Sequence, residues 1–249
     1  MKFIYLNLQE LIEILSHMRV LQIRLWLFFL FLSTFSSTIA QNQQLIDSLL
    51  EKLESKISDK EQVGVLTDLA WEFFYTDTST FNAYISDAIQ LAEGIGYLEG
   101  KIDAIHTTAR SYLLRGFFGT AKIYYGQTIA LAREIRYEAG EAYGINGYGH
   151  LKMYNGEYDS AIHYYEQATT IMEKGSHPPT LGLCYQHLAR AYTNKSDYAT
   201  SIGYYDRALQ LVDERERYNS YMGLGVIYYY QGLNTKSFEY NFKALVLSP

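Results

Sequence analysis

The residues that could carry out chemistry are few, and their spacing matches no catalytic or metal-binding motif. The histidines lie at positions 17, 106, 150, 163, 177 and 187, and no two of them have the HxxxH or HExxH spacing of a zinc site. Cys184 is the only cysteine, so it can form no internal disulfide, and we expect a buried small apolar residue. No nucleophile lies within a catalytic motif. The sequence therefore predicts no enzyme, no cofactor and no metal site.

Two short patterns resemble functional motifs and are interpreted as turns. The stretch "GIGYLEGK", residues 94–101, lacks the GxxxxGK spacing of a phosphate-binding loop, and Ile102 stands where that loop needs Ser or Thr. The stretch "NKS", residues 194–196, has the pattern of a glycosylation sequon. It falls at an expected turn between two helices, and we regard the match as coincidental.

An internal repeat is the strongest signal in the chain. The segments "FFGTAKIYYGQT", "EYDSAIHYYEQA" and "DYATSIGYYDRA" begin at residues 117, 157 and 197 and have the same pattern. A small residue recurs in steps of 40, 40 and 36 at Ala121, Ala161, Ser201 and Ser237. An aromatic residue follows with the same steps at Tyr124, Tyr164, Tyr204 and Tyr240. A fixed period of this size predicts a solenoid of stacked repeats.

A second helix is predicted ahead of each of these segments. Its large and small residues recur four apart, which places them on one helical face. The large column is Leu66, Ile105, Ile145, Tyr185 and Tyr221, and the small column is Ala70, Ala109, Gly149, Ala189 and Gly225. Gly116, Gly156, Ser196 and Gly232 stand between the two helices, where a turn is expected. Each copy is thus a helix, a tight turn and a second helix, and three glycines weaken the first helix of copy three.

This pattern resembles the tetratricopeptide repeat. Copy four matches the family's alternation of large, small and aromatic positions at Tyr185, Leu188, Ala189, Tyr192, Ser196, Tyr198, Ser201, Tyr205 and Ala208. The resemblance covers residues 62–249 and implies an all-α fold, an α-solenoid of five repeats at about 62–96, 97–136, 137–176, 177–214 and 215–249. The period exceeds the usual 34 or so, which is similar to longer-period variants in bacterial sensor and regulator proteins. We expect the extra residues to lengthen the helices.

The resemblance also implies a ligand-binding groove. In the family, the first helices line a concave surface that holds extended peptides. Two columns point there, namely His106, Arg110, Asn146, His150, Gln186, Arg190, Met222 and Val226, preceded in copy one by Thr67 and Trp71. Three successive copies thus present basic and amide groups, which suit a carboxylate or an acidic peptide. A solvated polar face without a ligand is the competing interpretation. Binding of such a peptide should weaken with added salt. It should also weaken as the pH rises through about 6.5, if the histidines have an ordinary pKa.

The two ends of the repeat array differ. Residues 41–61 have an apolar stripe and are predicted to form an N-terminal capping helix. The last segment carries Phe238, Phe242, Leu245 and Leu247 with no later repeat to cover them. Because solenoids usually need a polar terminal cap, this end is expected either to self-associate or to continue into a further segment.

The N-terminus has the layout of a targeting segment. Residues 18–40 combine Arg19 and Arg24, an apolar run and a small-residue cleavage site before Gln41, which predicts a secretory signal peptide and a periplasmic location. The alternative is an uncleaved inner-membrane anchor over residues 20–40. Residues 1–17 carry Glu10 and Glu13, which do not fit a signal, so Met18 is the expected start.

The net charge and composition of the chain limit the kinds of macromolecule that it is expected to bind. The net charge is −6, with no basic block, which excludes duplex nucleic acid as an expected partner. Tyr-Tyr doublets are interpreted as one core residue beside one residue at a helix boundary. The sequence predicts an exported scaffold that binds proteins or peptides and catalyses nothing. The alternative is the sensory region of a larger signalling protein, such as a histidine kinase or a transcription regulator.

Overall fold

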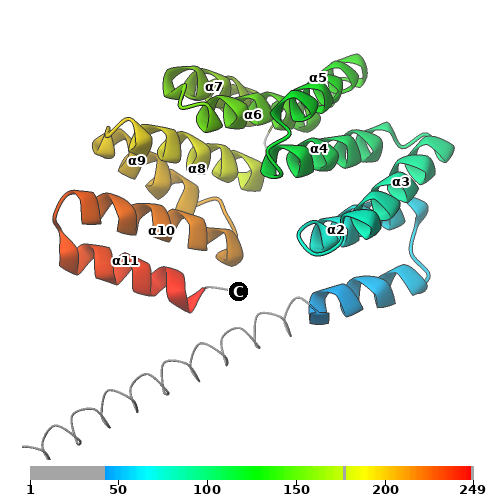
Figure 1. Ribbon diagram of the computed structural model, residues 1–249, viewed down its shortest axis with the longest axis horizontal. Helices are drawn as coiled ribbons and strands as arrows, with labels where there is room; N and C mark the ends of the chain where they lie inside the picture. Colours follow the sequence, from blue (N-terminus) through cyan, green and yellow to red (C-terminus); the bar gives the residue numbers. More distant parts are fainter. Residues whose placement is uncertain (1–42, 176–177, 248–249) are drawn as a thin grey trace, which may run out of the picture. The chain divides into compact units, whose positions relative to one another are not determined.

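The computed structural model describes residues 43–175 and 178–247. The chain forms two compact units, residues 1–48 and 49–249. Residues 43–48 of the first unit and 49–54 of the second are helical. Figure 1 shows the helices of the second unit, which are α2 (Asp59–Phe73), α3 (Thr78–Gly94), α4 (Leu98–Leu114), α5 (Phe118–Ile135), α6 (Glu138–Tyr154), α7 (Tyr158–Gly175), α8 (Pro178–Asn194), α9 (Tyr198–Leu209), α10 (Glu214–Tyr230) and α11 (Asn234–Val246). The predicted leader, signal peptide and anchor lie outside the described residues. Within 43–175 and 178–247, no helix combines the length and apolarity needed to cross a membrane.

The helices pair into hairpins that stack side by side. Each even-numbered helix packs on the odd-numbered helix that follows it, from α2 with α3 to α10 with α11. Each second helix also contacts the first helix of the next hairpin, as α5 does with α6. The described residues contain no strand. The predicted all-α solenoid of helix-turn-helix repeats is confirmed.

The turn inside the second, third, fourth and fifth hairpins depends on a residue with positive φ. Gly116, Gly156 and Gly232 have φ values of 81°, 74° and 75°, and Ser196 has 62°. After each of these residues a backbone N–H returns to the helix before it, as Phe117 N–H does to the Tyr112 carbonyl at 2.9 Å. This left-handed ending satisfies carbonyls that the helix leaves open, and Gly adopts it without the steric cost that Ser196 bears.

The recurring small residue lies where the two helices of a hairpin cross. Ala121, Ala161 and Ser201 have no exposed surface. Ser201 Oγ donates to the Ala189 carbonyl at 2.7 Å, and Ser237 Oγ donates to the Gly225 carbonyl at 2.9 Å. The column contains only Ala and Ser in hairpins two to five, whereas the first hairpin has the buried Phe81 at this position.

Glycines in α6 have a packing role that their low helix propensity conceals. A Cβ added at Gly147 would overlap the ring of Tyr125, and one added at Gly149 would overlap the ring of Tyr165. Both tyrosines are fully buried. The weakness predicted for this helix is therefore offset by the burial of two large aromatic rings against its backbone.

Helix lengths account for the period. α5 continues past Thr128 to Ile135, so residues beyond the aligned hairpin extend the helix. α9 has 12 residues where α5 and α7 have 18, and this shorter helix precedes the single step of 36. α2 begins at Asp59, slightly before the predicted bound of 62, because the Ser58 side chain caps the backbone N–H of Glu61. Membership of the longer-period variant stays a prediction.

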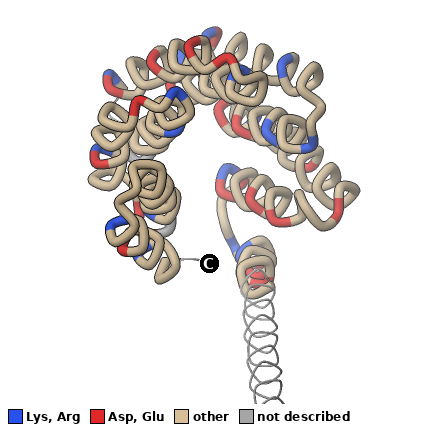
Figure 2. Tube along the Cα trace, turned by 60° about the vertical axis from the view of Figure 1, so that its left-hand side comes forward, with Lys and Arg blue, Asp and Glu red and all other residues tan. Residues whose placement is uncertain are grey.

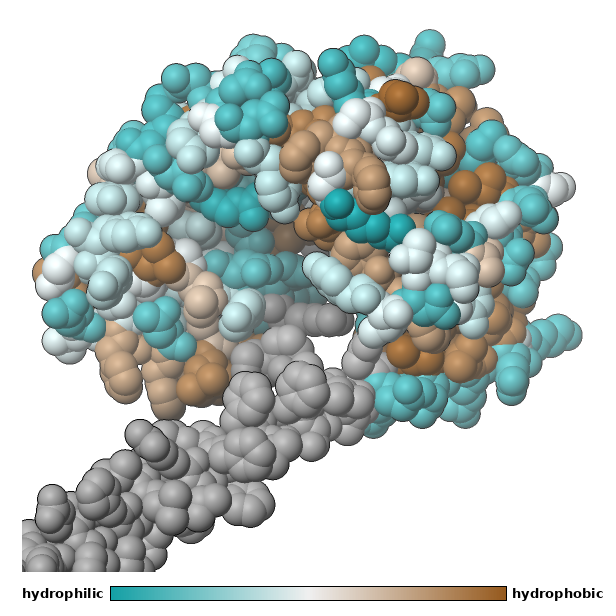
Figure 3. All heavy atoms as spheres, in the orientation of Figure 1, coloured by the Kyte–Doolittle hydropathy of each residue, from teal (hydrophilic) through white to brown (hydrophobic). Residues whose placement is uncertain are grey.

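The last helix presents an apolar face. Phe238, Phe242, Leu245 and Val246 of α11 are 75%, 55%, 66% and 68% exposed. In Figure 3 apolar surface gathers over α11, at the lower left of the view. Among the described residues α11 contacts only its hairpin partner, whereas every other second helix also meets the next hairpin.

Candidate functional site

A cavity of about 640 Å³ lies on the concave side of the solenoid, and we call it the central cavity. All five first helices contribute to it, from α2 to α10, so residues distant in sequence face a common space. Figure 2 shows how the curved backbone brings these helices around one interior. Its lining is Thr67, Asp68, Asp103, His106, Thr107, Arg110, Tyr143, Asn146, Gly147, His150, Thr180, Leu183, Gln186, His187, Arg190, Tyr205, Glu216 and Asn219.

The structure brings most of the predicted groove residues together. Six of the eight candidate site residues line the central cavity, namely His106, Arg110, Asn146, His150, Gln186 and Arg190. Trp71 lies beside it, with its ring 3.9 Å from Cζ of Arg110, a cation–π contact between α2 and α4. Met222 lines an adjoining cavity that shares Arg190 with the first. Ligand binding by these residues stays a prediction.

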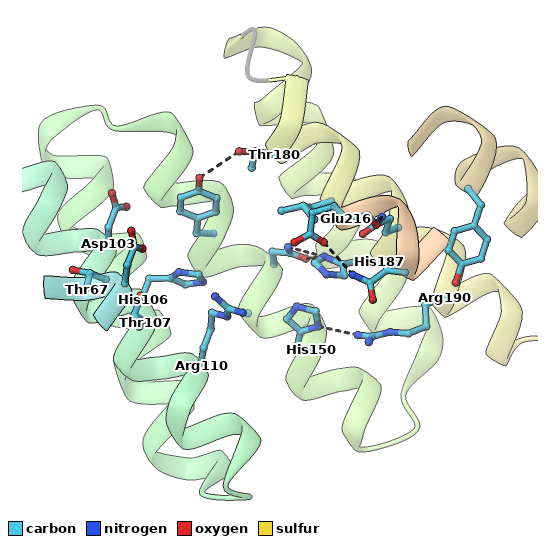
Figure 4. Close-up of a pocket in the computed structure, with 18 residues that line it drawn as sticks. Thr67, Asp103, His106, Thr107, Arg110, His150, Thr180, His187, Arg190 and Glu216 are labelled. Carbon is cyan, nitrogen blue, oxygen red and sulfur yellow. Dashed lines mark hydrogen bonds between the residues drawn. The ribbon is translucent and has the colours of Figure 1, made fainter. Parts of the chain in front are cut away.

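A hydrogen-bonded network joins the middle of the groove, and Figure 4 shows its labelled members. Nδ1 of His150 lies 3.2 Å from an Arg190 guanidinium nitrogen and 2.8 Å from the Tyr165 hydroxyl. The Asn146 amide meets Nδ1 of His187 at 2.9 Å. These bonds tie α6 to α8 and fix the orientation of two groove histidines.

The groove histidines are neutral at ordinary pH, which corrects the expectation that they titrate near 6.5. Burial, with a smaller contribution from Arg110, lowers the pKa of His106 to about 3. Burial also lowers the pKa values of His150 and His187 well below 6.5, with Arg190 adding to the effect on both. Removing an imidazolium from water beside guanidinium groups disfavours its charge. The positive charge of the groove therefore comes from arginine alone. Among the described residues, no three His, Cys, Asp or Glu side chains are arranged to hold a metal ion.

Carboxylates also line the central cavity, and the sequence analysis did not identify them. Asp103 on α4 accepts from the Tyr137 hydroxyl, with its two oxygens at 3.1 and 3.2 Å. Burial raises the pKa of Asp103 to about 7, against the opposing effect of that hydrogen bond. Burial likewise raises the pKa of Asp68. The groove is therefore mixed in charge rather than uniformly basic, with its acidic groups toward α2, α4 and the start of α10.

These residues could have been found from their spacing. Asp103, Tyr143 and Asn219 each precede a predicted groove residue by three positions, which is about one helical turn. They form a third column on the same face as the two columns already identified. His187 lies in a fourth column with Thr107 and Gly147. Each of these residues directly follows a residue of the first predicted groove column, which contains His106, Asn146 and Gln186.

The second tyrosine of each Tyr-Tyr doublet in α5, α7 and α9 is buried in the core. Tyr125, Tyr165 and Tyr205 are 0%, 0% and 5% exposed. Tyr124, Tyr164 and Tyr204 are half-buried and stack or tilt against tyrosines of the first helices, as Tyr124 does on Tyr112 at a centroid distance of 5.4 Å. One member of each pair fills the core, as expected, and the other joins an aromatic stack instead of a helix boundary.

Arg110 and Arg190 are exposed residues that line this cavity. Neither forms an ion pair with a carboxylate among the described residues. Arg110 lies over Trp71, and Glu216 is near enough to raise its pKa, although burial lowers it by more. In Figure 4 the two arginines approach from α4 and α8 with His150 between them. This arrangement can accept a carboxylate through charge-assisted hydrogen bonds.

The sequence of this chain was compared with models of known protein families and with curated proteins. The family model of the tetratricopeptide repeat matches residues 184–217, which span much of α8, all of α9 and the start of α10. No curated protein matches the chain in sequence.

Several solved structures share the fold. BtubC (BKLC) from P. vanneervenii has a TM-score of 0.58 at 16% identity, covering 84% of this chain and 89% of that one. A Rap protein complexed with competence and sporulation factor has a TM-score of 0.63 at 17% identity, covering 82% of this chain and 60% of that one. RapI without ligand has a TM-score of 0.52 at 14% identity, covering 79% and 86%. The chain is therefore a solenoid of tetratricopeptide-type hairpins that carries a tetratricopeptide repeat at residues 184–217.

Proposed function

We propose that this chain is a non-catalytic scaffold that binds a protein segment or peptide in the central cavity, and that the bound segment carries a carboxylate. The observation that carries the proposal is that Arg110 and Arg190 both line the central cavity and that neither forms an ion pair with a carboxylate among the described residues. A Rap protein of the same fold, solved in complex with competence and sporulation factor, supports a binding role.

The central cavity has a size and chemistry that fit a short segment. Ligand pockets commonly enclose about 300–1,000 Å³, and the cavity volume of about 640 Å³ lies within that range. Asn146 and Asn219 add amide groups that can pair with a peptide backbone, whereas the Gln186 amide nitrogen already donates to the Glu216 carbonyl and to Ser220 Oγ. Asp103, which titrates near pH 7, adds little negative charge below that pH.

The test is a peptide-binding screen with the double variant Arg110→Ala and Arg190→Ala. We expect the wild-type chain to retain peptides that contain Asp, Glu or a free carboxyl group, and binding to weaken with added salt. The double variant should lose these ligands. Arg133→Ala on α5, whose guanidinium pairs with Glu141, is the matched control and should bind as the wild type does. A double variant that keeps every wild-type ligand would sink the proposal.

A second candidate is the sensory region of a larger signalling protein, and the exposed face of α11 favours it. In the other hairpins the second helix is covered by the next first helix, and α11 carries four exposed large apolar residues instead. Further packed chain or self-association would cover them. Genomic sequence past Pro249 that encodes an apolar span and a catalytic domain would support this candidate, and a stop codon would contradict it.

Export to the periplasm is part of the first proposal and rests on residues 18–40. A mature protein that begins at Gln41 by N-terminal sequencing would support it. Recovery of membrane-bound protein that retains Met18 would instead support the uncleaved anchor.

A further inference from the structure

A second cavity adjoins the central cavity where α8 faces α10, and we call it the Met222 cavity. It encloses about 570 Å³. Arg190, Tyr205 and Asn219 line both cavities, so the two adjoin each other. The walls found only in the Met222 cavity include Thr193, Asn194, Tyr198, Met222, Val226 and Tyr230.

The walls of the Met222 cavity include apolar and aromatic groups that remain accessible. Met222 and Val226 lie four residues apart on one face of α10 and are 37% and 38% exposed. The rings of Tyr198 and Tyr230 stack with centroids 6.2 Å apart, so residues from two successive hairpins form one aromatic wall. Apolar surface left accessible inside a concavity is typical of a site that takes an apolar group.

The difference in polarity between the two cavities corresponds to a difference between repeat copies at the same two columns. Met222 and Val226 occupy the columns that carry His106 and Arg110 in copy two. The same columns carry Gln186 and Arg190 in copy four, so these two columns are polar in copies two to four and apolar in α10. Arg190 lies at the border, with its guanidinium bonded to His150 on the side of the central cavity.

A segment that follows the groove past Arg190 therefore passes from a charged site to an apolar one. We propose that the Met222 cavity binds a bulky apolar side chain of the same peptide whose carboxylate is held by Arg110 and Arg190. This inference rests on the proposed peptide-binding function. It adds that one position of the peptide carries an apolar side chain of the size of Leu, Met or Phe. The carboxylate and the apolar side chain act together, because each occupies one of two adjoining cavities.

The experiment is a positional-scanning hexapeptide library applied to the full chain and to single variants. Val226→Asp places a charge in the Met222 cavity, and Met222→Gln replaces the thioether with an amide of similar length. Ile123→Asp on α5 is the matched control, because Ile123 is an aliphatic residue, 61% exposed, outside both cavities. Circular dichroism shows whether each variant keeps its helical content.

We expect the wild-type chain to select acidic residues at one library position and Leu, Met or Phe at another. Val226→Asp should reduce the apolar selection at least tenfold and leave the acidic selection in place, and Met222→Gln should reduce it in the same direction. Ile123→Asp should select as the wild type does. Acidic selection without apolar selection in the wild type, or unchanged apolar selection in both cavity variants, would overturn the inference. A wild-type chain that retains no library peptide would overturn the proposed function itself.

Discussion

The hydroxyl of Tyr165 in α7 and Nδ1 of His150 in α6 are 2.8 Å apart. A guanidinium nitrogen of Arg190 reaches the same Nδ1 at 3.2 Å. Guanidinium can only donate, so Nδ1 is the acceptor of this bond and the imidazole proton resides on Nε2. Arg190 thus sets the tautomer of a residue at the centre of the groove, and the hydroxyl of the buried Tyr165 shares the same acceptor atom.

The first prediction compares two buried tyrosines that occupy the same column. Tyr165→Phe should lower the free energy of unfolding by about 0.5–1.5 kcal/mol, because it removes a made hydrogen bond. The Tyr125 hydroxyl is buried without a hydrogen-bond partner in the part of the chain described. Tyr125→Phe should therefore be neutral or stabilising. Urea unfolding of both variants checks this, and an equal loss in the two would contradict it.

The second prediction compares two helical glycines. Gly147→Ala improves helix propensity but places a Cβ against the ring of Tyr125, so it should cost about 1–3 kcal/mol of unfolding free energy. At Gly203 in α9 an added Cβ meets nothing within 4 Å, so Gly203→Ala should stabilise by up to about 1 kcal/mol. Thermal and urea unfolding measure both. Stabilisation by Gly147→Ala would show that the α6 glycines have no packing role.

The third prediction concerns pH and Asp103. The pKa of Asp103 is about 7 in the fold and near the ordinary aspartate value of 3.8 when unfolded, so between those pH values the folded state holds the extra proton. Stability contributed by this site therefore falls as pH rises from about 4 to about 7. Asp103→Asn should remove that loss and gain about 1–3 kcal/mol over the parent at pH 8, with little difference at pH 4.

Chemical unfolding at the two pH values tests the Asp103 prediction. Asp87→Asn, a change at an exposed aspartate of α3, serves as the control and should not alter the pH dependence. A difference between Asp103→Asn and the parent that stays constant with pH would argue against titration of this carboxyl near neutrality.

The fourth prediction concerns the apolar face of α11. The chain should self-associate through this face, because Phe238, Phe242 and Leu245 expose large apolar area. Phe242→Glu should shift it toward monomer in sedimentation experiments, whereas Ile123→Glu on α5 should not. A parent chain that is monomeric at high concentration would count against the prediction.

The hairpin frame could be predicted from sequence because each of its elements repeats. The small residues, such as Ala161, and the turn residues, such as Gly156, stand at fixed intervals, and each has one local physical role. The two groove columns followed from the resemblance on the same basis. Periodicity therefore determines where an element lies and which face it presents.

The electrostatics of the groove could not be predicted in the same way. The low pKa values of His106, His150 and His187 depend mainly on burial, which sequence spacing does not contain, and arginines from other hairpins add to the effect on His150 and His187. The raised pKa of Asp103 depends mainly on burial, with Tyr137 on the next hairpin opposing it. The glycines of α6 were interpreted by propensity alone because their aromatic partners lie on neighbouring helices. Each of these properties arises only when separate hairpins come together.

The bond between Tyr165 and His150 also has an evolutionary consequence. Among the described residues the hydroxyl of Tyr125 has no hydrogen-bond partner, so Arg110 is not bonded to this core tyrosine and a substitution at Arg110 should leave the frame intact. His150 shares a hydrogen bond with a buried residue, so a substitution at either position leaves the other without its partner. Descendants of this chain are therefore free to diverge singly at position 110, whereas positions 150 and 165 should change as a pair.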